Sequence, residues 1–211
     1  MKKCLFLLLT FFNIGQLFAA DILIEEGKDY KLLSVPISVV NIPRGKVHVI
    51  EFFSYNCVHC RAVEPLIKEK LAINKKIALD TIQIVYDEKY NGAFARINAT
   101  IKLLHLERLE KAIFAAVAEQ KDFNDVIQLK QFLAKNGLNQ KQIEQFMDTY
   151  NSFTVNGKVN EYKQLTTEYN VIATPTIVVA DKYVVSPAQP EKLIQVTQAL
   201  VNKIINNKLK K

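Results

Sequence analysis

The alternation of hydrophobic and polar residues changes after Phe53 from a strand pattern to a helix pattern. Before that point, Val47–Phe53 is apolar on both faces apart from Glu51, which predicts a strand buried on both sides. Beyond residue 60 the spacing is helical, and Pro65 inside this stretch predicts a kink. The residues that carry the helical pattern are Val63, Leu66, Ile67 and Leu71.

Further strands and helices follow in a definite order. A strand is expected at residues 77–86, which completes a β-α-β unit, and a first strand at residues 30–35. From residue 89 to residue 170 apolar positions recur at helical spacing. Two short strands, 176–180 and 183–185, are joined so tightly that they must form an antiparallel hairpin, and a last helix closes the chain.

The first twenty residues differ in character from the rest. Two lysines precede an apolar run at residues 4–12, and small residues follow at Ala19 and Ala20. Because the run is too short to span a bilayer, residues 1–20 are predicted to be a secretory signal peptide, cut after one of these alanines. An uncleaved anchor is the alternative, and no later segment is apolar for long enough to cross a membrane.

Cleavage would change both the cysteine count and the charge. Loss of Cys4 leaves Cys57 and Cys60, and loss of two lysines lowers the formal net charge from +7. The positive balance is interpreted as a solvated, lysine-rich surface, with weak attraction to anionic membranes as the alternative. No nucleic-acid partner is expected. A hydrophobic content of 49% and a charged content of 23% are those of an ordinary globular protein.

The candidate chemistry lies where the buried strand meets the helix, at Cys57-Val58-His59-Cys60. A C-x-x-C within a β-α-β unit is typical of a thioredoxin-type redox site. At the helix start, Cys57 meets unpaired N–H groups and the positive end of the helix dipole, which favour the thiolate. Cys60 lies one turn further in and is expected to be shielded. A charged His59 would stabilise the thiolate further; the alternative is an exposed histidine without a role.

With this motif, the order β-β-α-β, helices, β-β-α predicts an α/β protein with a thioredoxin fold and an inserted helical domain. The thioredoxin-like domain is expected to comprise residues 21–88 and 171–211. The helical insertion is expected at residues 89–170.

Other uses of a C-x-x-C fit the chain less well. A zinc site needs four ligands, and His48 and His105 are placed too far apart to join the cysteines. Haem attachment needs a histidine where Arg61 stands. A structural disulfide would close so small a loop that it would remove little entropy from the unfolded chain. The C-x-x-C is therefore predicted to be a redox pair that uses no metal or cofactor.

A second signal is the segment NVIATPT at residues 170–176. Here the chain resembles the thioredoxin superfamily, whose members place a cis-proline opposite the C-x-x-C, and Pro175 occupies that position. The resemblance implies that the backbone of Thr174 is exposed at the active-site face and pairs with an extended substrate. The alternative is a trans-proline that merely starts a strand.

Within the superfamily the chain most resembles the DsbA-type periplasmic disulfide oxidoreductases. The matching residues are EGKDY at 26–30, VIEFFS at 49–54, the second half of the C-x-x-C and the proline. The resemblance implies that Cys57 is the nucleophile, Cys60 the resolving cysteine and Glu51 a buried acid that moves protons. The alternative for the acid is a strand-end residue that reaches water.

The resemblance also implies a cellular role. It predicts a periplasmic protein that donates its disulfide to reduced or unfolded exported proteins and is recycled by a quinone-linked membrane oxidase. Because no dimerisation domain precedes Tyr30, a monomer is expected.

The chain departs from the family pattern at three points. Val58 stands where proline is frequent, Thr174 stands where valine is common, and residues 77–86 contain no lysine to pair with the buried acid. A disulfide isomerase or a reductase is therefore kept as one alternative function. A chaperone-like module that binds unfolded chains through an apolar surface is the other.

Overall fold

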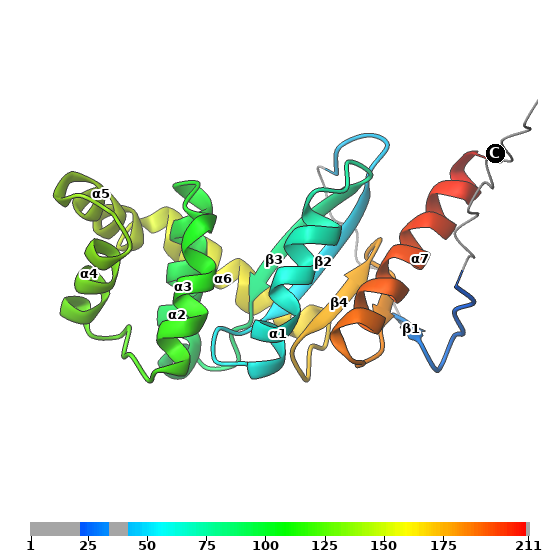
Figure 1. The fold of residues 1–211 in the computed structure, drawn as a ribbon, viewed down its shortest axis with the longest axis horizontal. Helices are drawn as coiled ribbons and strands as arrows, with labels where there is room; N and C mark the ends of the chain where they lie inside the picture. Colours follow the sequence, from blue (N-terminus) through cyan, green and yellow to red (C-terminus); the bar gives the residue numbers. More distant parts are fainter. Residues whose placement is uncertain (1–21, 34–41, 210–211) are drawn as a thin grey trace, which may run out of the picture.

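The computed structural model describes residues 22–33 and 42–209 of the chain (Figure 1). The predicted signal peptide and its cleavage site lie outside the described residues. At the centre is a sheet of order β1-β5-β4-β2-β3. Its strands are β1 (Tyr30–Leu32), β2 (Val47–Phe53), β3 (Ile77–Gln83), β4 (Thr176–Val179) and β5 (Tyr183–Val185). No helix within the described ranges is long and apolar enough to cross a membrane.

Strand β2 lies inside the sheet, parallel to β3 and antiparallel to β4. All seven of its residues are buried, which confirms the predicted strand covered on both sides. β4 and β5 form the predicted antiparallel hairpin. β3 ends earlier than residue 86, because its partner β2 stops at Phe53 and leads into a helix.

A parallel pair of strands needs a crossover, and here it has two parts. Helix α1 (Val58–Leu66) contains Pro65, and a π-helix at Ile67–Ala72 continues it. Proline has no N–H to donate and its ring displaces the carbonyl one turn back, so regular α-helical hydrogen bonding is interrupted there. The irregularity expected at Pro65 is thus a change from α-helix to π-helix.

Helices cover both faces of the sheet (Figure 1). α1 and α7 (Pro190–Leu209) pack on one face, and α2 (Glu88–Leu103) and α6 (Phe153–Glu168) pack on the other. Between α2 and α6 the chain forms α3 (Glu110–Ala118), α4 (Val126–Lys135) and α5 (Gln140–Tyr150). Figure 1 shows α4 and α5 at one end of the long axis and α7 at the other.

Local sequence signals explain where the inserted helices begin and end. Asn139 and Gln142 form the capping box at the start of α5 that their spacing indicates. Ser152 caps α6 by accepting the N–H of Val155 at 3.2 Å. Gly137 follows α4 with φ +86°, a left-handed conformation that suits glycine. The boundaries of the insertion at residues 89 and 170 stay a prediction.

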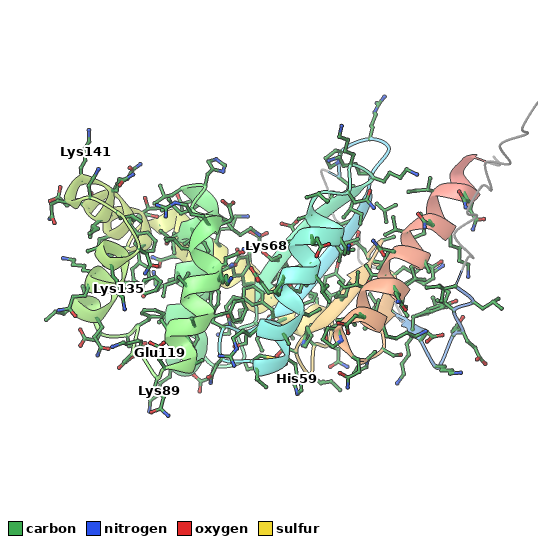
Figure 2. All side chains as sticks on the ribbon, viewed as in Figure 1. His59, Lys68, Lys89, Glu119, Lys135 and Lys141 are labelled. Carbon is green, nitrogen blue, oxygen red and sulfur yellow. The ribbon has the colours of Figure 1, made fainter. Side chains whose placement is uncertain are left out.

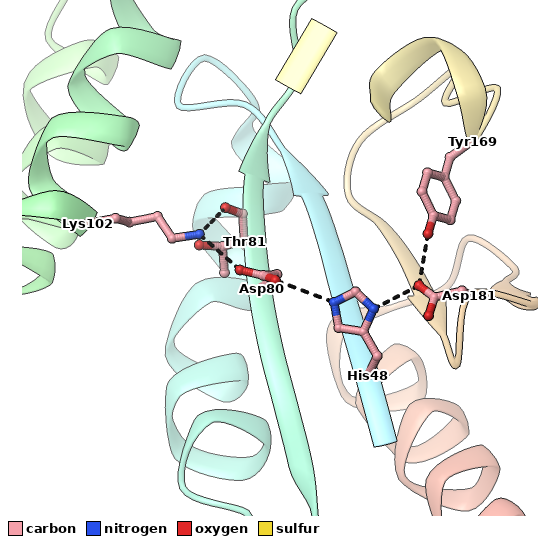
Figure 3. A network of polar contacts seen from close by, with 6 residues as sticks. All are labelled: His48, Asp80, Thr81, Lys102, Tyr169 and Asp181. Carbon is pink, nitrogen blue, oxygen red and sulfur yellow. Dashed lines mark hydrogen bonds and ion pairs between the residues drawn. The ribbon is translucent and has the colours of Figure 1, made fainter. Parts of the chain in front are cut away.

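One polar network, centred on the buried His48, ties the sheet to the inserted helices (Figure 3). His48 on β2 contacts Asp181 Oδ1 through Nδ1 at 2.7 Å and Asp80 Oδ2 through Nε2 at 3.4 Å. Tyr169, at the end of α6, donates to Asp181 at 2.8 Å. Lys102 of α2 contacts Asp80 at 3.3 Å. His48 thus links two strands and a turn to residues from both helices on that face of the sheet.

Candidate active site

Cys57 occupies the N-cap position of α1. Its backbone is extended, with φ −99° and ψ 115°, and its N–H donates to the Ser54 carbonyl at 2.9 Å. Its Sγ accepts the N–H of Cys60 at 3.2 Å, as an N-cap side chain does. The end of β2 and the start of α1 therefore aim the sulfur at the helix N-terminus, where a negative charge is stabilised.

The loop before β4 lies directly against this sulfur. In the thiol form, Cys57 Sγ–H donates to the Thr174 carbonyl at 3.4 Å, although 117 residues separate them in the chain. The peptide bond between Thr174 and Pro175 is cis, as the resemblance implies. Two exposed apolar side chains lie next to these groups in the sequence: Val58, the first residue of α1, is 61% exposed, and Ile172, in the loop before β4, is 85% exposed.

The two cysteines differ sharply in proton affinity. A hydrogen bond with the Cys60 side chain lowers the pKa of Cys57 most, and burial opposes it. Further hydrogen bonds from the Thr174 side chain and from the N–H groups of Cys60 and His59 bring that pKa to about 5. The hydrogen bond with Cys57 and burial raise the pKa of Cys60 well above its ordinary value. Cys57 is therefore the thiolate at neutral pH, and Cys60 keeps its proton.

In the described part of the chain, no hydrogen bond joins the ring of His59 to the sulfur of Cys57 or Cys60. Its side chain is exposed at the start of α1, on the outside of the molecule (Figure 2). Within the described residues that ring forms no hydrogen bond or ion pair. What the structure places near Cys57 is the backbone N–H of His59.

Glu51 is buried in the middle of β2, with 5% of its surface exposed. A strand-end acid that reaches water is therefore excluded. Burial, followed by repulsion from Glu110 and Glu64, raises its pKa to about 8. The negative charge at Cys57 contributes to this raised pKa, and no hydrogen bond within the described residues joins Glu51 to Cys60. Glu51 is therefore mainly protonated at neutral pH.

The carboxyl of Glu51 borders a cavity of about 210 Å³ that also contacts α1, the π-helix and α3. Lys68 borders the same cavity and forms ion pairs with Glu64 at 2.6 Å and with Glu110 of α3 at 3.1 Å. Lys68 is labelled in Figure 2. Its charge lowers the pKa of Glu51, but the ion pairs that it forms are with Glu64 and Glu110.

Sequence reasoning missed Lys68 as a site residue. The available signal was its spacing of four residues from Glu64, which puts both side chains on one helix face. That spacing gives no indication of the contact with Glu110. Within the described ranges, this site included, no three His, Cys, Asp or Glu side chains gather in a way that could hold a metal ion.

Comparisons with known proteins agree with this geometry. A family model described as Thioredoxin matches residues 42–199. The chain is 33% identical over 216 residues to the thiol:disulfide interchange protein DsbA of Burkholderia cepacia, covering 99% of this chain and all of that protein. It is 33% identical over 188 residues to DsbA of Pseudomonas syringae pv. tomato, covering 85% of this chain and 84% of that one.

Solved structures show the same fold. The crystal structure of Pseudomonas aeruginosa DsbA superposes with a TM-score of 0.78 at 27% identity, covering 89% of this chain and 97% of that one. The oxidoreductase NmDsbA3 of Neisseria meningitidis superposes with a TM-score of 0.74 at 28% identity, covering 89% and 100%. The predicted fold class, a thioredoxin fold with a helical insertion, is confirmed, and the chain belongs to the DsbA family of thiol:disulfide interchange proteins.

Proposed function

We propose that this protein is a periplasmic oxidase that donates the Cys57–Cys60 disulfide to reduced or unfolded exported proteins. A substrate thiolate attacks Cys57 Sγ, a mixed disulfide forms, and Cys60 leaves and takes up a proton. A second substrate thiolate then attacks the substrate sulfur and releases Cys57 as a thiolate. Two electrons pass to the protein, which becomes a dithiol, and the substrate gains one disulfide.

The observation that carries this proposal is the pKa of Cys57, lowered to about 5. A thiol of low pKa is the better leaving group, so the second step, which releases Cys57, is fast. Stabilising the thiolate also stabilises the reduced protein, which makes the disulfide form a stronger oxidant. In an isomerase or a reductase, which is the alternative, the thiolate would have to stabilise the reduced form less than it does here.

Substrate docking is assigned to the loops that flank the sulfur. An extended substrate segment would pair with the backbone of Thr174, beside Pro175, as an added strand. The exposed side chains of Val58 and Ile172 support this assignment, because unfolded chains present apolar groups. The same surface would also serve the chaperone-like alternative.

Glu51 is proposed to move the proton that Cys60 takes up. A carboxyl with a pKa of about 8 carries a proton at neutral pH and releases it without a large penalty. Lys68 would tune that pKa by its charge. His59 is kept as a candidate that supports the Cys57 thiolate when protonated.

The surroundings of the enzyme are proposed from the same reasoning. The signal-like N-terminus supports a periplasmic location, and reoxidation by a quinone-linked membrane oxidase would complete the cycle. A monomer that needs no cofactor is the form expected to act.

Two single substitutions test the proposal. Cys57→Ser is expected to abolish disulfide transfer to a reduced, unfolded substrate, because the attacked sulfur is gone. Cys60→Ser is expected to accumulate mixed disulfides through Cys57, because no neighbouring thiol resolves them. Mass spectrometry of purified variants reads out both results.

Assays of refolding and of protection of unfolded chains separate the alternatives. Recovery of a scrambled disulfide protein by the wild type, faster than oxidation of a reduced one, would favour an isomerase. The chaperone-like module would be favoured if wild type and Cys57→Ser protected unfolded chains equally well and Cys60→Ser carried no adducts. That result would contradict the oxidase.

A further inference from the structure

A small hollow lies on the side of Cys57 that faces the inserted helices. It has a volume of about 120 Å³ and is bordered by Tyr55 and Asn56 before Cys57, by Cys57 itself, by Val58 and Arg61 of α1, and by α3. The residues that α3 contributes are Phe114, Val117 and Ala118. The Thr174 carbonyl also contacts Cys57, but Thr174 does not border this hollow. The sulfur therefore has a second neighbouring surface, formed by α3.

The walls of the hollow are mainly apolar. Phe114 and Val117 are buried, whereas Val58 and Ala118 are exposed and leave the mouth open. Arg61 is exposed at its border and forms no ion pair with any described residue. An apolar side chain would lose water contact here, whereas a lysine or arginine would meet the charge of Arg61.

The size of the hollow limits what it can take. A cavity of about 150 Å³ in a protein holds one benzene molecule. A hollow of about 120 Å³ therefore suits a branched aliphatic side chain better than an aromatic ring.

The geometry of an extended substrate decides which of its residues reaches the hollow. The reacting cysteine points its side chain at Cys57. Side chains two positions apart lie on the same face of a strand, about 6.6 Å from one another, and immediate neighbours point away. Because the hollow borders Cys57 directly, the side chain two positions from the substrate cysteine is the one within reach.

We propose that the hollow between α1 and α3 is a specificity subsite that selects substrates with a branched aliphatic residue two positions from the reacting cysteine. The inference deepens the proposed function and rests on it. Arg61 makes the subsite disfavour lysine and arginine there, and Ala118 keeps it open for the aliphatic group.

A peptide series tests the subsite. Reduced peptides with one pair of cysteines carry leucine, alanine, tryptophan or lysine at two positions before or after the reacting cysteine, or at the immediate neighbours. Oxidised wild-type protein is expected to oxidise the leucine peptide about tenfold faster than the alanine peptide, measured as kcat/KM, when leucine stands two positions away. Tryptophan and lysine are expected to give no gain over alanine.

A matched pair of variants places the effect at the hollow. Ala118→Leu fills it and is expected to lower the leucine-to-alanine ratio from about tenfold to about one. Ala115→Leu is the control, because Ala115 is exposed on the same helix but borders a different hollow, towards α4, and the ratio should persist.

Failure of the inference differs from failure of the proposed function. Equal rates for all peptides, a preference only at the immediate neighbours, or a ratio unaffected by Ala118→Leu would overturn the subsite while leaving the oxidase intact. Failure to oxidise any peptide would overturn the oxidase, and the subsite with it.

Discussion

The chemistry of the protein depends first on one residue, Cys57, and on what surrounds its sulfur. The largest influence on its pKa is the side chain of Cys60. We therefore expect Cys60→Ala to raise the pKa of Cys57 from about 5 towards that of an ordinary thiol. The pH dependence of the alkylation rate of Cys57 measures this change. An unchanged midpoint would show that the backbone N–H groups of α1 suffice on their own.

Glu51 is the second residue whose titration has a global consequence. The folded protein keeps its proton up to about pH 8, whereas a glutamate in the unfolded chain loses it near 4.5. Because the folded state binds more protons in this window, the stability of the protein falls as pH rises through it. Glu51→Gln removes this dependence and is expected to raise the free energy of unfolding at pH 7 by up to about 3 kcal/mol.

The measurement is denaturant unfolding at pH values between the unfolded and folded pKa of Glu51. The oxidised protein is used because its Cys57 does not titrate. Glu107→Gln is the control, because Glu107 borders the same cavity but is exposed. If Glu51→Gln were no more stable than the wild type at pH 7, and its stability fell equally with pH, Glu51 would be ionised in the folded protein.

At the scale of elements, His48 connects segments that lie before and after the helical insertion in the sequence (Figure 3). Burial disfavours its charged form, but hydrogen bonds to Asp181 and Asp80 outweigh this and raise its pKa to about 9. The imidazolium therefore donates to two carboxylates at neutral pH. A raised histidine pKa contributes stability below its ordinary value of 6.5, and this contribution is lost as pH rises through about 9.

We expect His48→Gln to remove this pH dependence. Between about pH 6 and about pH 9, the wild type should lose about 3 kcal/mol more free energy of unfolding than the variant. Chemical denaturation across this range measures the difference. His105→Gln, at an exposed histidine, should follow the wild type. Parallel curves for wild type and His48→Gln would mean that His48 is neutral in the folded protein.

At the scale of the whole molecule, the elements that repeat a local pattern were predictable. The seven apolar-rich residues of β2, the helix after Cys57, the capping box of Asn139 and the final hairpin were each encoded within a few residues. The order of these elements then sufficed for the fold, since a β-α-β unit and an antiparallel hairpin meet in few ways.

Features that arise between distant segments were not predictable. Asp181 contacts His48 across 133 residues, and Glu110 of α3 contacts Lys68 of the π-helix. Neither pair has a sequence pattern: the first is set by the pairing of β2 with β4, and the second by the packing of α3 against the π-helix. The π-helix was missed for another reason: Pro65 predicts an interruption but not which hydrogen bonds replace the lost ones.

The proposed oxidase requires that the folded protein stabilise its own reduced state through the Cys57 thiolate. At pH 7, a thiol with a pKa of about 5 favours the reduced form by about 2.3 kcal/mol more than the thiol of thioredoxin, with a pKa near 7. For a two-electron couple this corresponds to about 50 mV above the thioredoxin potential of about −270 mV.

Equilibration of the Cys57–Cys60 pair with glutathione redox buffers at pH 7 measures that potential directly. We predict a value of about −220 mV, more oxidising than thioredoxin. A potential at or below about −270 mV would contradict it, because the folded protein would then gain nothing in its reduced state from the thiolate.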